Sequence, residues 1–498
     1  MLSLVWFKRD LRVHDHPALA LAAAQGAVLP VYIIEPELWA QPDASARQWA
    51  FVAESLHELR RDLADLGQPL ILRVGEAVDV LARLRAKHRF AQIVSHEETG
   101  NGWSRARDRR VAAWARESNL PWIELPQSGV ERNGPGPDGW AARRDRLIAQ
   151  PLAQVAALKP VADGTGAVPS AKSLKLADDA CPFRQPGGRA AGMLALNSFT
   201  ASRGLTYRGA LSSALTAERA CSRLSPYLAF GALSGREVAQ AIGAQKQVRR
   251  GQAGWGASLR RFEAQLGCRD HGVQQLEDRP DMETRALHPA LEGVHPMQPD
   301  ATRLAAWQRG ETGLPFVDAC MRYLRATGWL NFRMRAMLQS VASYHLWLDW
   351  RVSGAHLARQ FTDYEPGIHW VQVQLQSGVA GMGAPRFLDP VRHGQEHDPG
   401  GLFIRRWVPE LSPVPDRFLH APWTWPQARQ LLGARYPEPV IDPAAGLRTA
   451  RAALAARRHQ PGFKADAARI VAQHGSRKSR PPPGARARPP SAQLRLDL

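Results

Sequence analysis

Short apolar runs alternate with longer amphipathic stretches in residues 1–130, and this alternation constrains the fold more than any other feature. Four of the runs have the length of a buried strand: Leu2–Phe7, Val28–Ile34, Leu70–Val74 and Gln92–His96. Gln48–Leu66 and Val78–Lys87 lie between them and carry apolar residues at helical spacing. Because strands that alternate with helices form parallel sheets, we expect an α/β domain here. No Gly-x-Gly-x-x-Gly motif follows the first strand, so a dinucleotide site of that type is not predicted.

The second half of the chain has a helical pattern. From about Asn197 to Arg359, apolar residues recur every three or four positions. Residues 360–405 lose this periodicity, and an irregular segment inside a helical domain is a common place for a ligand. The sequence therefore predicts four parts: an α/β domain at 1–130, a turn-rich inter-domain linker at 131–195, an all-α domain at 196–470, and a disordered, basic Pro/Arg-rich tail at 471–498.

Positive charge is the most marked property of the composition. The chain has 65 basic and 46 acidic residues, a formal net charge of +19 at neutral pH. The segment Gly475–Leu498 contributes +5, so +14 remains on the rest of the chain. Such an excess is typical of proteins that bind nucleic acid, because each neutralised phosphate releases condensed counterions. The alternative is an arginine-rich composition that serves no partner.

The cysteines and the apolar runs indicate whether the chain binds a metal, is secreted or spans a membrane. Cys181, Cys221, Cys268 and Cys320 stand far apart, and none forms the Cys-x-x-Cys pair typical of zinc or iron–sulfur ligation. We therefore expect reduced, packed thiols and no metal centre. No secretory signal is evident, and no run approaches the roughly 18 apolar residues of a membrane span. These patterns predict a cytoplasmic monomer without membrane contact.

Residues 6–19 (W-F-K-R-D-L-R-V-H-D-H-P-A-L) form the first of three segments that carry candidate site residues. They leave the first strand. Arg9, Asp10 and Arg12 are expected to form an ion-pair network that fixes the turn. Asp15 is expected to cap a helix that begins near Pro17.

Residues 220–234 (A-C-S-R-L-S-P-Y-L-A-F-G-A-L-S) form the second segment. Hydroxyls at Ser222 and Ser225 flank the guanidinium of Arg223, and Pro226 stands just inside a predicted helix. Backbone N–H groups and the helix dipole at such a start suit a pyrophosphate. An ordinary capped helix explains the same residues equally well.

The third segment runs through T-G-L-P-F-V-D-A-C-M-R (312–322), T-G-W-L-N-F-R-M-R (327–335), D-Y-E-P-G-I-H-W (363–370) and F-I-R-R-W-V-P-E-L (403–411). Its helical arginines, Arg333 and Arg335, are predicted to lie near Asp363 and Glu365. The four side chains are expected to form a buried ion pair around a planar cofactor.

Together, in this order and spacing, the three segments resemble the DNA photolyase/cryptochrome family over roughly residues 1–425. The resemblance implies a Rossmann-like α/β domain followed by an all-α FAD-binding domain that holds FAD in a U shape. It implies a light-driven DNA photolyase of the deoxyribodipyrimidine photo-lyase type, which repairs UV-damaged pyrimidines by electron transfer from excited reduced flavin. The alternative is a cryptochrome-type blue-light photoreceptor that binds FAD without repairing DNA. A third hypothesis is a flavin-binding helical protein with no light role.

The resemblance also implies roles for cofactor-binding residues. Those that match contacts to the FAD phosphates and ribityl chain are Tyr207, Ser222, Arg223, Leu224 and Ser225. Arg335 and Asp363 match the ion pair beside the isoalloxazine, and Glu365 matches an acidic position at the ribityl and adenine side. Arg269 is expected among the cofactor contacts. Arg269, Arg333 and Arg405 are also candidate contacts to a phosphate or a lesion.

Two residues match catalytic positions of the family. His369 stands where the family places the residue that faces flavin N5, and Trp350 matches the middle member of the family's tryptophan chain. For His369 the alternative is a histidine satisfied by neighbouring backbone. Val373 replaces the flavin-proximal tryptophan and Met297 the surface one. Trp329, Trp347 and Trp370 are candidates for another electron route, against the alternative that most of the 16 tryptophans only fill the core.

The lesion-contacting positions also depart from the family pattern. Gln265 and Cys268 stand where the family has a glutamate and a tryptophan, and Leu375 replaces a second lesion-stacking tryptophan. Loss of a stacking partner weakens binding by about 1–3 kcal/mol per base. A lesion other than the cyclobutane dimer is thus expected if the protein repairs DNA. The pair Glu97-Glu98 is a candidate contact to a second, antenna chromophore, against the alternative of a solvated loop.

Overall fold

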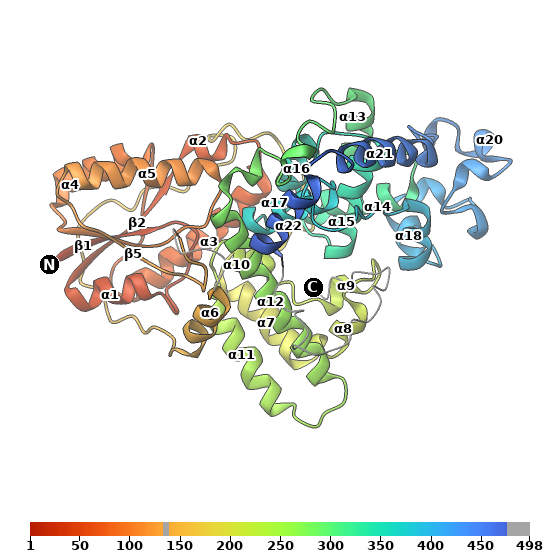
Figure 1. Cartoon of the computed structure of the whole chain (residues 1–498). Helices are drawn as coiled ribbons and strands as arrows, with labels where there is room; N and C mark the ends of the chain where they lie inside the picture. Colours follow the sequence, from red (N-terminus) through yellow and green to blue (C-terminus); the bar gives the residue numbers. More distant parts are fainter. Residues whose placement is uncertain (133–138, 476–498) are drawn as a thin grey trace, which may run out of the picture.

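The first part of the chain forms a parallel sheet with helices on both faces (Figure 1). The structure is a computed structural model that describes residues 1–132 and 139–475. The five strands are β1 (Leu2–Phe7), β2 (Ala27–Ile34), β3 (Ile71–Val74), β4 (Gln92–His96) and β5 (Trp122–Leu125). They lie in the order β3-β2-β1-β4-β5, the doubly wound order of a Rossmann-like domain. The expected α/β fold is confirmed, and most of the expected basic tail falls outside the described residues.

The two faces of the sheet pack against different helices, because alternate side chains of a strand point to opposite sides. Val5 of β1 packs with α1 (Pro17–Gln25) and α3 (Ala46–Asp65). Trp6, the next residue, packs with α4 (Ala77–His88) and α5 (Gly102–Glu117). Strands covered on both faces appear in a sequence as continuous apolar runs, which is why β1 to β4 could be predicted. The edge strand β5 is half-buried and was not predicted.

The turn after β1 is held by a buried cluster rather than by the expected ion-pair network. Asp10 Oδ2 accepts hydrogen bonds from His16 Nε2 at 2.9 Å and from His96 Nδ1 at 2.7 Å. Burial alone would raise the pKa of Asp10, but these two hydrogen bonds hold that pKa well below its usual value. Arg9 and Arg12 donate to backbone carbonyls instead of to Asp10. The prediction of a network among the three charged residues was wrong.

The cap of α1 also differs from the prediction. His16, not Asp15, caps the helix, because its Nδ1 accepts a hydrogen bond from the backbone N–H of Leu19 at 2.9 Å. Asp15 has a positive φ of 49° and turns its carboxylate toward the helical part. There it accepts hydrogen bonds from Ser234 and Arg236. The residue therefore ties the two parts of the chain together.

Residues 126–188 connect the two parts and include α6 (Trp140–Ala149). Beyond α6 the chain lies along the α/β domain without a helix or strand of its own. It is attached there by backbone hydrogen bonds, from Leu158 to Leu66 at 2.6 Å and from Leu72 to Thr165 at 2.7 Å. The turn-rich composition predicted this surface connection but not α6.

From Arg189 onward the described chain is helical. The longer helices are α7 (Arg189–Ala201), α11 (Gly235–Val248), α12 (Trp255–Asp278), α13 (Ala301–Arg309), α14 (Pro315–Thr327), α15 (Phe332–Ser340), α16 (Trp350–Gln360), α17 (Pro366–Gln376), α18 (Pro390–His397), α21 (Pro443–Arg458) and α22 (Phe463–His474). Short helices lie between them: α8 (Tyr207–Ala210), α9 (Ala217–Ala220), α10 (Ser225–Ala229), α19 (Leu402–Trp407) and α20 (Ala428–Leu432). A further short helix, α2 (Pro36–Trp39), belongs to the α/β domain.

The α/β and helical parts share one hydrophobic core. Phe51 of α3 contacts Tyr227 and Phe230 of the helical part, with ring centroids 5.4 and 5.5 Å apart. A second core surrounds α14, which is buried along most of its length. The last described helix, α22, places Ile470 in a cluster with residues of α12 and α17.

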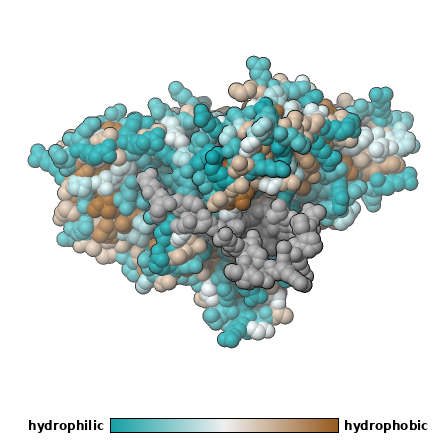
Figure 2. All heavy atoms as spheres, viewed as in Figure 1, coloured by the Kyte–Doolittle hydropathy of each residue, from teal (hydrophilic) through white to brown (hydrophobic). Residues whose placement is uncertain are grey.

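The surface of the described chain is mostly hydrophilic on the face seen in Figure 2, with apolar side chains in small groups. Among the described helices, none has the length and apolar character that a membrane span requires.

Candidate functional site

A cavity of about 250 Å³ lies in the helical part between α10, α12, α15 and α17. Two of these helices cross at very short range because glycines meet there: a Cβ at Gly367 would lie 2.5 Å from the Cα of Val273. Ten of the residues predicted to bind a cofactor line this cavity: Tyr207, Ser222, Arg223, Leu224, Ser225, Arg269, Arg335, Asp363, Glu365 and His369. Segments that are more than 100 residues apart in the sequence thus meet at one site. Trp350 lies outside the wall.

The ion pair between Arg335 and Asp363 forms one side of the cavity. Asn331 caps α15, since its side chain accepts from the N–H of Met334, and this fixes the start of the helix that carries Arg335. Arg335 Nη2 donates to Asp363 Oδ2 at 2.7 Å, and its guanidinium lies 4.0 Å from the ring centroid of Phe361. The Asp363 side chain is 3 % exposed and that of Arg335 24 %. The expected pair is present.

A second carboxylate, Glu365, lies between two arginines. It accepts a hydrogen bond from Arg269 Nη2 at 2.8 Å, and Arg9 Nη2 lies 3.8 Å away. Arg9 comes from the turn after β1 and also donates to the carbonyls of Ala229 and Tyr364. The α/β domain therefore helps to hold the cavity wall in place.

The segment predicted as an anion-binding helix start is built differently. α10 has only five residues and Leu224 at its N-cap, with no side-chain cap, so its dipole is small. Arg223 has a positive φ of 62°, lies over the ring of Trp329 at 4.1 Å and donates to Gln185 at 2.9 Å. The charge of Arg223, not the helix dipole, is what an anion would meet here.

His369 faces the cavity as a neutral ring. Burial lowers the pKa of His369 to about 4. Its Nε2 donates to the carbonyl of Gly354 at 2.8 Å, which leaves Nδ1 unprotonated and able to accept a hydrogen bond. His369 thus has the backbone hydrogen bond of the alternative prediction and also lies at the cavity wall.

Buried polar atoms that lack a partner gather in this cavity. Among the described residues, six such atoms in its wall have no hydrogen bond: Arg223 Nη1, Gln265 Nε2, Gln339 Oε1, Asp363 Oδ1, Glu365 Oε1 and Gln372 Oε1. Leaving a buried polar group unsatisfied costs about 1–3 kcal/mol. Donors and acceptors spread over one cavity wall fit a large ligand with phosphates, hydroxyls and a polar ring system, which is the chemistry of FAD.

Gln339 and Gln372 were not among the predicted site residues. A signal for the second was present, since α17 reads V-Q-V-Q-L-Q, with glutamines in an otherwise apolar helix. Gln372 and Gln376 lie one turn apart and both line the cavity. Polar residues at helical spacing in a buried helix indicate a polar cavity.

An aromatic path leads from the cavity to Trp350. The rings of His369 and Trp370 are 5.1 Å apart, and those of Trp370 and Trp350 are 6.0 Å apart. Val373, which the resemblance matched to the flavin-proximal tryptophan position, lines the cavity. Trp329 also lines the cavity but stacks on Arg223, on a separate part of the wall. Of the three tryptophans expected to form another route, Trp370 is the one that joins the cavity to Trp350.

The predicted lesion contacts are only partly at the cavity. Gln265 lines it, whereas Cys268 and Leu375 lie outside its wall. Leu375 packs instead against the cluster that contains Ile470 of α22. Arg405 of α19 donates to the carbonyls of Leu411 and Val414 and to Asp416 in the segment that follows this helix, and it does not line the cavity.

A smaller cavity of about 80 Å³ lies at the carboxyl edge of the sheet. Its wall includes Glu98, so this half of the Glu97-Glu98 pair lies at a cavity and not in a solvated loop. Tyr364 lines both this cavity and the larger one. Its hydroxyl donates to Asp43 at 2.8 Å and accepts from Trp370 Nε1 at 3.1 Å.

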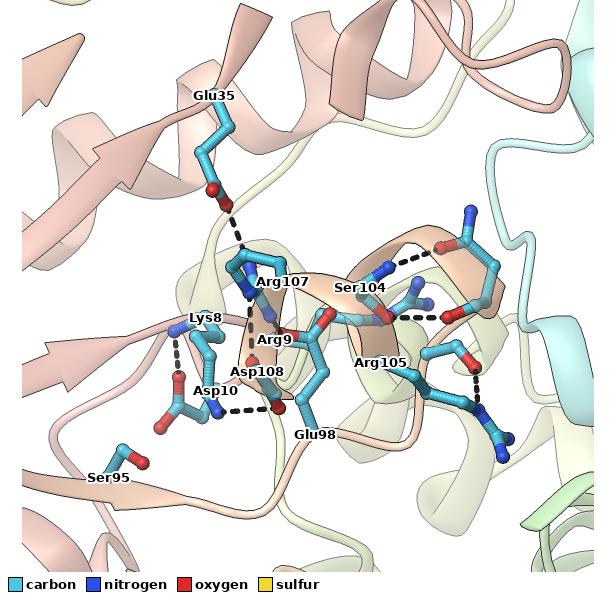
Figure 3. Close-up of polar contacts among 12 residues, drawn as sticks. Lys8, Arg9, Asp10, Glu35, Ser95, Glu98, Ser104, Arg105, Arg107 and Asp108 are labelled. Atoms are coloured by element: carbon cyan, nitrogen blue, oxygen red, sulfur yellow. Dashed lines mark hydrogen bonds and ion pairs between the residues drawn. The ribbon is translucent and has the colours of Figure 1, made fainter. Parts of the chain in front are cut away.

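Arg107, which the sequence analysis did not single out, organises the floor of the smaller cavity (Figure 3). Its guanidinium bonds to Glu35, Glu98 and Asp108, and the Arg107 side chain is only 3 % exposed. Burial would lower the pKa of Arg107, but the three carboxylates outweigh burial and hold the pKa above its usual value. The cluster depends on Arg107, because removal of this cation would leave the negative charges of Glu35 and Glu98 buried without a partner.

The fold and the larger cavity define a two-domain flavoprotein, in which a parallel α/β domain is joined to a helical domain that holds FAD. Comparison with known families agrees with this class. Residues 3–130 match the family model described as DNA photolyase, and residues 262–456 match the model described as the FAD binding domain of DNA photolyase. The chain belongs to the photolyase/cryptochrome family, and FAD is its cofactor.

Individual relatives carry both family names. A deoxyribodipyrimidine photo-lyase of Thermus thermophilus is 33 % identical over 422 residues, which cover 82 % of this chain and 92 % of the relative. Cryptochrome DASH of Gloeobacter violaceus is 27 % identical, covering 88 % of this chain and 93 % of the relative. A bacterial class III photolyase from Agrobacterium tumefaciens superposes with a TM-score of 0.79 at 25 % identity, covering 92 % and 98 % of the two chains.

Proposed function

We propose that this chain is a FAD-dependent, light-driven DNA photolyase of the deoxyribodipyrimidine photo-lyase type that acts on UV-damaged pyrimidines. The observation that carries the proposal is an amide donor, Gln265 Nε2, buried without a partner among the described residues in the wall that also holds Arg335 and Asp363. A cofactor and a flipped base can meet in such a cavity. The photo-lyase of Thermus thermophilus described above supports the same class.

In this proposal the residues of the larger cavity hold FAD. Arg223 and Ser222 meet its phosphates, the Arg335–Asp363 pair lies at the isoalloxazine, and Glu365 faces the ribityl and adenine side. Arg223, Asp363 and Glu365 each have a buried polar atom without a hydrogen-bond partner among the described residues, and the Arg335 side chain is 24 % exposed. FAD supplies the absorption of light and the electron that repair requires. The unprotonated Nδ1 of His369 accepts a hydrogen bond and so favours a flavin that carries a proton on the facing ring nitrogen.

The protein's own part in the reaction is to attract DNA and to hold the damaged base in a cavity away from water. The net charge of +19 suits a polyanion, and Arg333 is exposed on α15 next to Phe332, which lines the cavity. Because positive charge displaces condensed counterions from DNA, affinity for DNA is expected to fall steeply as salt is raised.

The cavity wall favours a lesion read by hydrogen bonds over one held by stacking. Gln265 offers an amide where the family has a carboxylate, and Cys268 and Leu375 leave the wall without the two expected tryptophans. An amide both donates and accepts, whereas an ionised carboxylate only accepts. The cyclobutane dimer carries N–H donors and carbonyl acceptors, and the pyrimidine–pyrimidone adduct adds a hydroxyl or amino group and an unprotonated ring nitrogen. The adduct, with more groups for an amide to read, is therefore the preferred candidate.

One observation favours a second candidate, the cryptochrome-type photoreceptor that binds FAD without repair. Leu375, at a lesion-stacking position of the family, packs against the cluster that contains Ile470 of α22. The described C-terminal helix thus occupies the neighbourhood of α17, where a photolyase needs room for a base. In this candidate, a light-driven change at the flavin would alter how α22 is attached.

For either candidate we place the electron route along Trp370 and Trp350. The ring contacts of 5.1 and 6.0 Å described above join them to His369 at the cavity. Replacement of Trp370 by phenylalanine should slow light-driven reduction of bound FAD. Replacement of Trp329, which stacks on Arg223, should not. The readout is the bleaching of oxidised flavin absorbance under blue light.

We also propose that the smaller cavity in the α/β domain holds a second, antenna chromophore. Aromatic and apolar side chains line it, among them Trp39, Phe230 and Tyr364, with the charged floor of Arg107 beneath. A structurally similar archaeal photolyase from Sulfolobus tokodaii contains two FAD molecules, which implies a light-harvesting cofactor in that protein. The absorption spectrum and the flavin content of the purified protein test this, because a different chromophore adds a band that FAD does not have, and a second FAD raises the flavin content above one per chain.

Repair of defined lesions distinguishes the two functions. FAD-loaded protein is first reduced with dithionite without oxygen. It is then given oligonucleotides with a single cyclobutane dimer or a single pyrimidine–pyrimidone adduct, under blue light and in the dark. Light-dependent loss of the adduct is expected, reduced by Gln265→Ala. Glu263→Ala, on the same helix but outside the cavity wall and paired with Lys246, is the matched control. If neither lesion is repaired while FAD remains bound, the photolyase proposal fails. The photoreceptor candidate then predicts light-dependent hydrogen exchange in α22.

A further inference from the structure

Helix α18 carries the sequence H-G-Q-E-H, with His393 and His397 one turn apart and Glu396 beside them. Residues four positions apart lie on the same face of a helix. None of the three lines the larger cavity, so the cluster is separate from the flavin site. Two imidazoles at this spacing are a known arrangement for holding a metal ion from a single helix.

The geometry brings three ligand atoms together. One nitrogen from each histidine and one carboxylate oxygen of Glu396 all lie within 4.8 Å of one another. The two rings are 4.4 Å apart at their centroids and inclined by 65°. A tetrahedral zinc site with bonds near 2.0–2.1 Å needs its ligand atoms about 3.3 Å apart. Rotation of the exposed Glu396 side chain can supply most of the difference.

One of the two histidines has a buried nitrogen without a partner. His393 is 6 % exposed, and its Nε2 has no hydrogen-bond partner among the described residues. A buried polar atom of this kind calls for an explanation, and a bound ion is one that would satisfy it.

Two charged neighbours bear on cation binding. Glu396 forms an ion pair with Arg392 at 2.8 Å, but both side chains are more than half exposed, and such pairs are weak enough to be exchanged. Arg333 lies close to both histidines, and its positive charge opposes a cation. Its guanidinium is exposed to solvent, which screens that repulsion.

We propose that His393, Glu396 and His397 form a binding site for a divalent transition-metal ion such as Zn²⁺, with one coordination position open to solvent. Two imidazoles and one carboxylate select zinc, cobalt or nickel over magnesium and calcium, which prefer oxygen ligands. The ion would fasten α18 immediately before Asp398, whose carboxylate accepts from the backbone N–H groups of Phe403 and Ile404 in α19. The site would therefore stabilise the junction between α18 and α19.

Titration with Co²⁺ tests the proposal, because its visible absorption reports tetrahedral nitrogen and oxygen ligation. Protein stripped with a chelator is titrated with Co²⁺ and then with Zn²⁺ as competitor. Saturable binding of one ion per chain is expected in the wild type and in His57→Gln, a control at an exposed position of α3. His393→Gln/His397→Gln should weaken binding by at least about tenfold, the effect of disturbing even an outer ligand.

Single variants guard against loss of the fold. His397→Gln and Glu396→Gln change half-buried or exposed side chains, and each should weaken Co²⁺ binding while circular dichroism stays unchanged. The proposal is wrong if the wild type binds no stoichiometric ion. It is also wrong if the double variant binds as the wild type does, which would place the ion elsewhere, for example at the buried Asp10, His16 and His96 cluster. Near-ultraviolet charge-transfer bands, which indicate thiolate ligands, would overturn it as well.

Discussion

Replacement of Asp363 by asparagine tests how the larger cavity binds FAD. The change keeps the shape of the side chain and removes the charge that faces Arg335 at 2.7 Å. It also alters Oδ1, a buried acceptor with no partner among the described residues. A hydrogen bond to a charged group contributes about 1.5–3 kcal/mol. The Kd for FAD should therefore rise by roughly 10–150-fold.

The same change should lower the stability of the FAD-free protein by a smaller amount. Breaking a fully buried ion pair costs about 3–5 kcal/mol. The Arg335 side chain is 24 % exposed, so water can solvate part of the charge that loses its partner. We expect a decrease of about 1–2 kcal/mol in the free energy of unfolding, between the values for surface and buried pairs.

Asp349→Asn is a closely matched control. Asp349 pairs with Arg351 at 3.1 Å, and their side chains are 5 % and 26 % exposed, close to the values of the first pair. The pair lies outside the cavity wall, and asparagine still caps α16. This variant should lose comparable stability and keep the wild-type Kd for FAD.

Flavin fluorescence during titration of the FAD-free protein measures the Kd, and urea unfolding measures the stability. The reasoning is refuted if Asp363→Asn binds FAD as tightly as the wild type. It is equally refuted if both variants lose affinity to the same degree, because the effect would then be one of general stability.

Three further outcomes rest on single contacts. Arg107→Met leaves Glu35 and Glu98 buried without their cation, while Asp108 keeps Lys8 and Arg132. The change should cost about 3–5 kcal/mol of unfolding free energy, read by urea denaturation, and a loss below about 1 kcal/mol would contradict a charged cluster. Burial lowers the pKa of His356 to about 3, so the unfolded chain binds a proton below about pH 6.5 that the folded chain does not. The free energy of unfolding should therefore fall as the pH drops from about 7.5 to about 5, and it should fall less in His356→Gln. Gly367→Ala places a Cβ 2.5 Å from the Cα of Val273 and should reduce both the FAD content and the Tm. Gly272→Ala, whose new Cβ has its nearest contact at 3.3 Å, should change both quantities little. Equal effects of the two variants would contradict the close crossing of α12 and α17.

The sheet was predictable from the sequence because its strands are covered on both faces. β1 and β4 have the predicted bounds, and β2 and β3 differ by one residue. The edge strand β5 lacks such a signal, since its four residues are half-buried and too few to show a period. The cap of α1 was mispredicted because an aspartate is the usual cap, whereas here His16 accepts from the helix and Asp15 serves the contact between domains.

The residues that line the larger cavity were largely predictable by resemblance, but the contacts that hold them were not. Position in a motif identified the Arg335–Asp363 pair, whereas the segment at Ser225 is built differently from the predicted capped helix start, because α10 has only five residues and no side-chain cap. The three-carboxylate cluster around Arg107 joins α5 to Glu35 and Glu98, which follow β2 and β4, and no local sequence pattern reveals contacts between such distant segments. The metal ligands proposed on α18 were missed for a simpler reason: only cysteine spacing was used to predict whether a metal could bind.

Tyr364 separates the two cavities and belongs to both, and the smaller cavity is closed partly by Phe230 and Pro366 of the helical part. An excised N-terminal domain would therefore carry an open groove in place of a closed pocket. A chimera that joins this helical domain to the α/β domain of a relative would inherit one wall from each parent. The affinity of that pocket for a bound molecule would therefore depend on how well the surfaces of the two domains match.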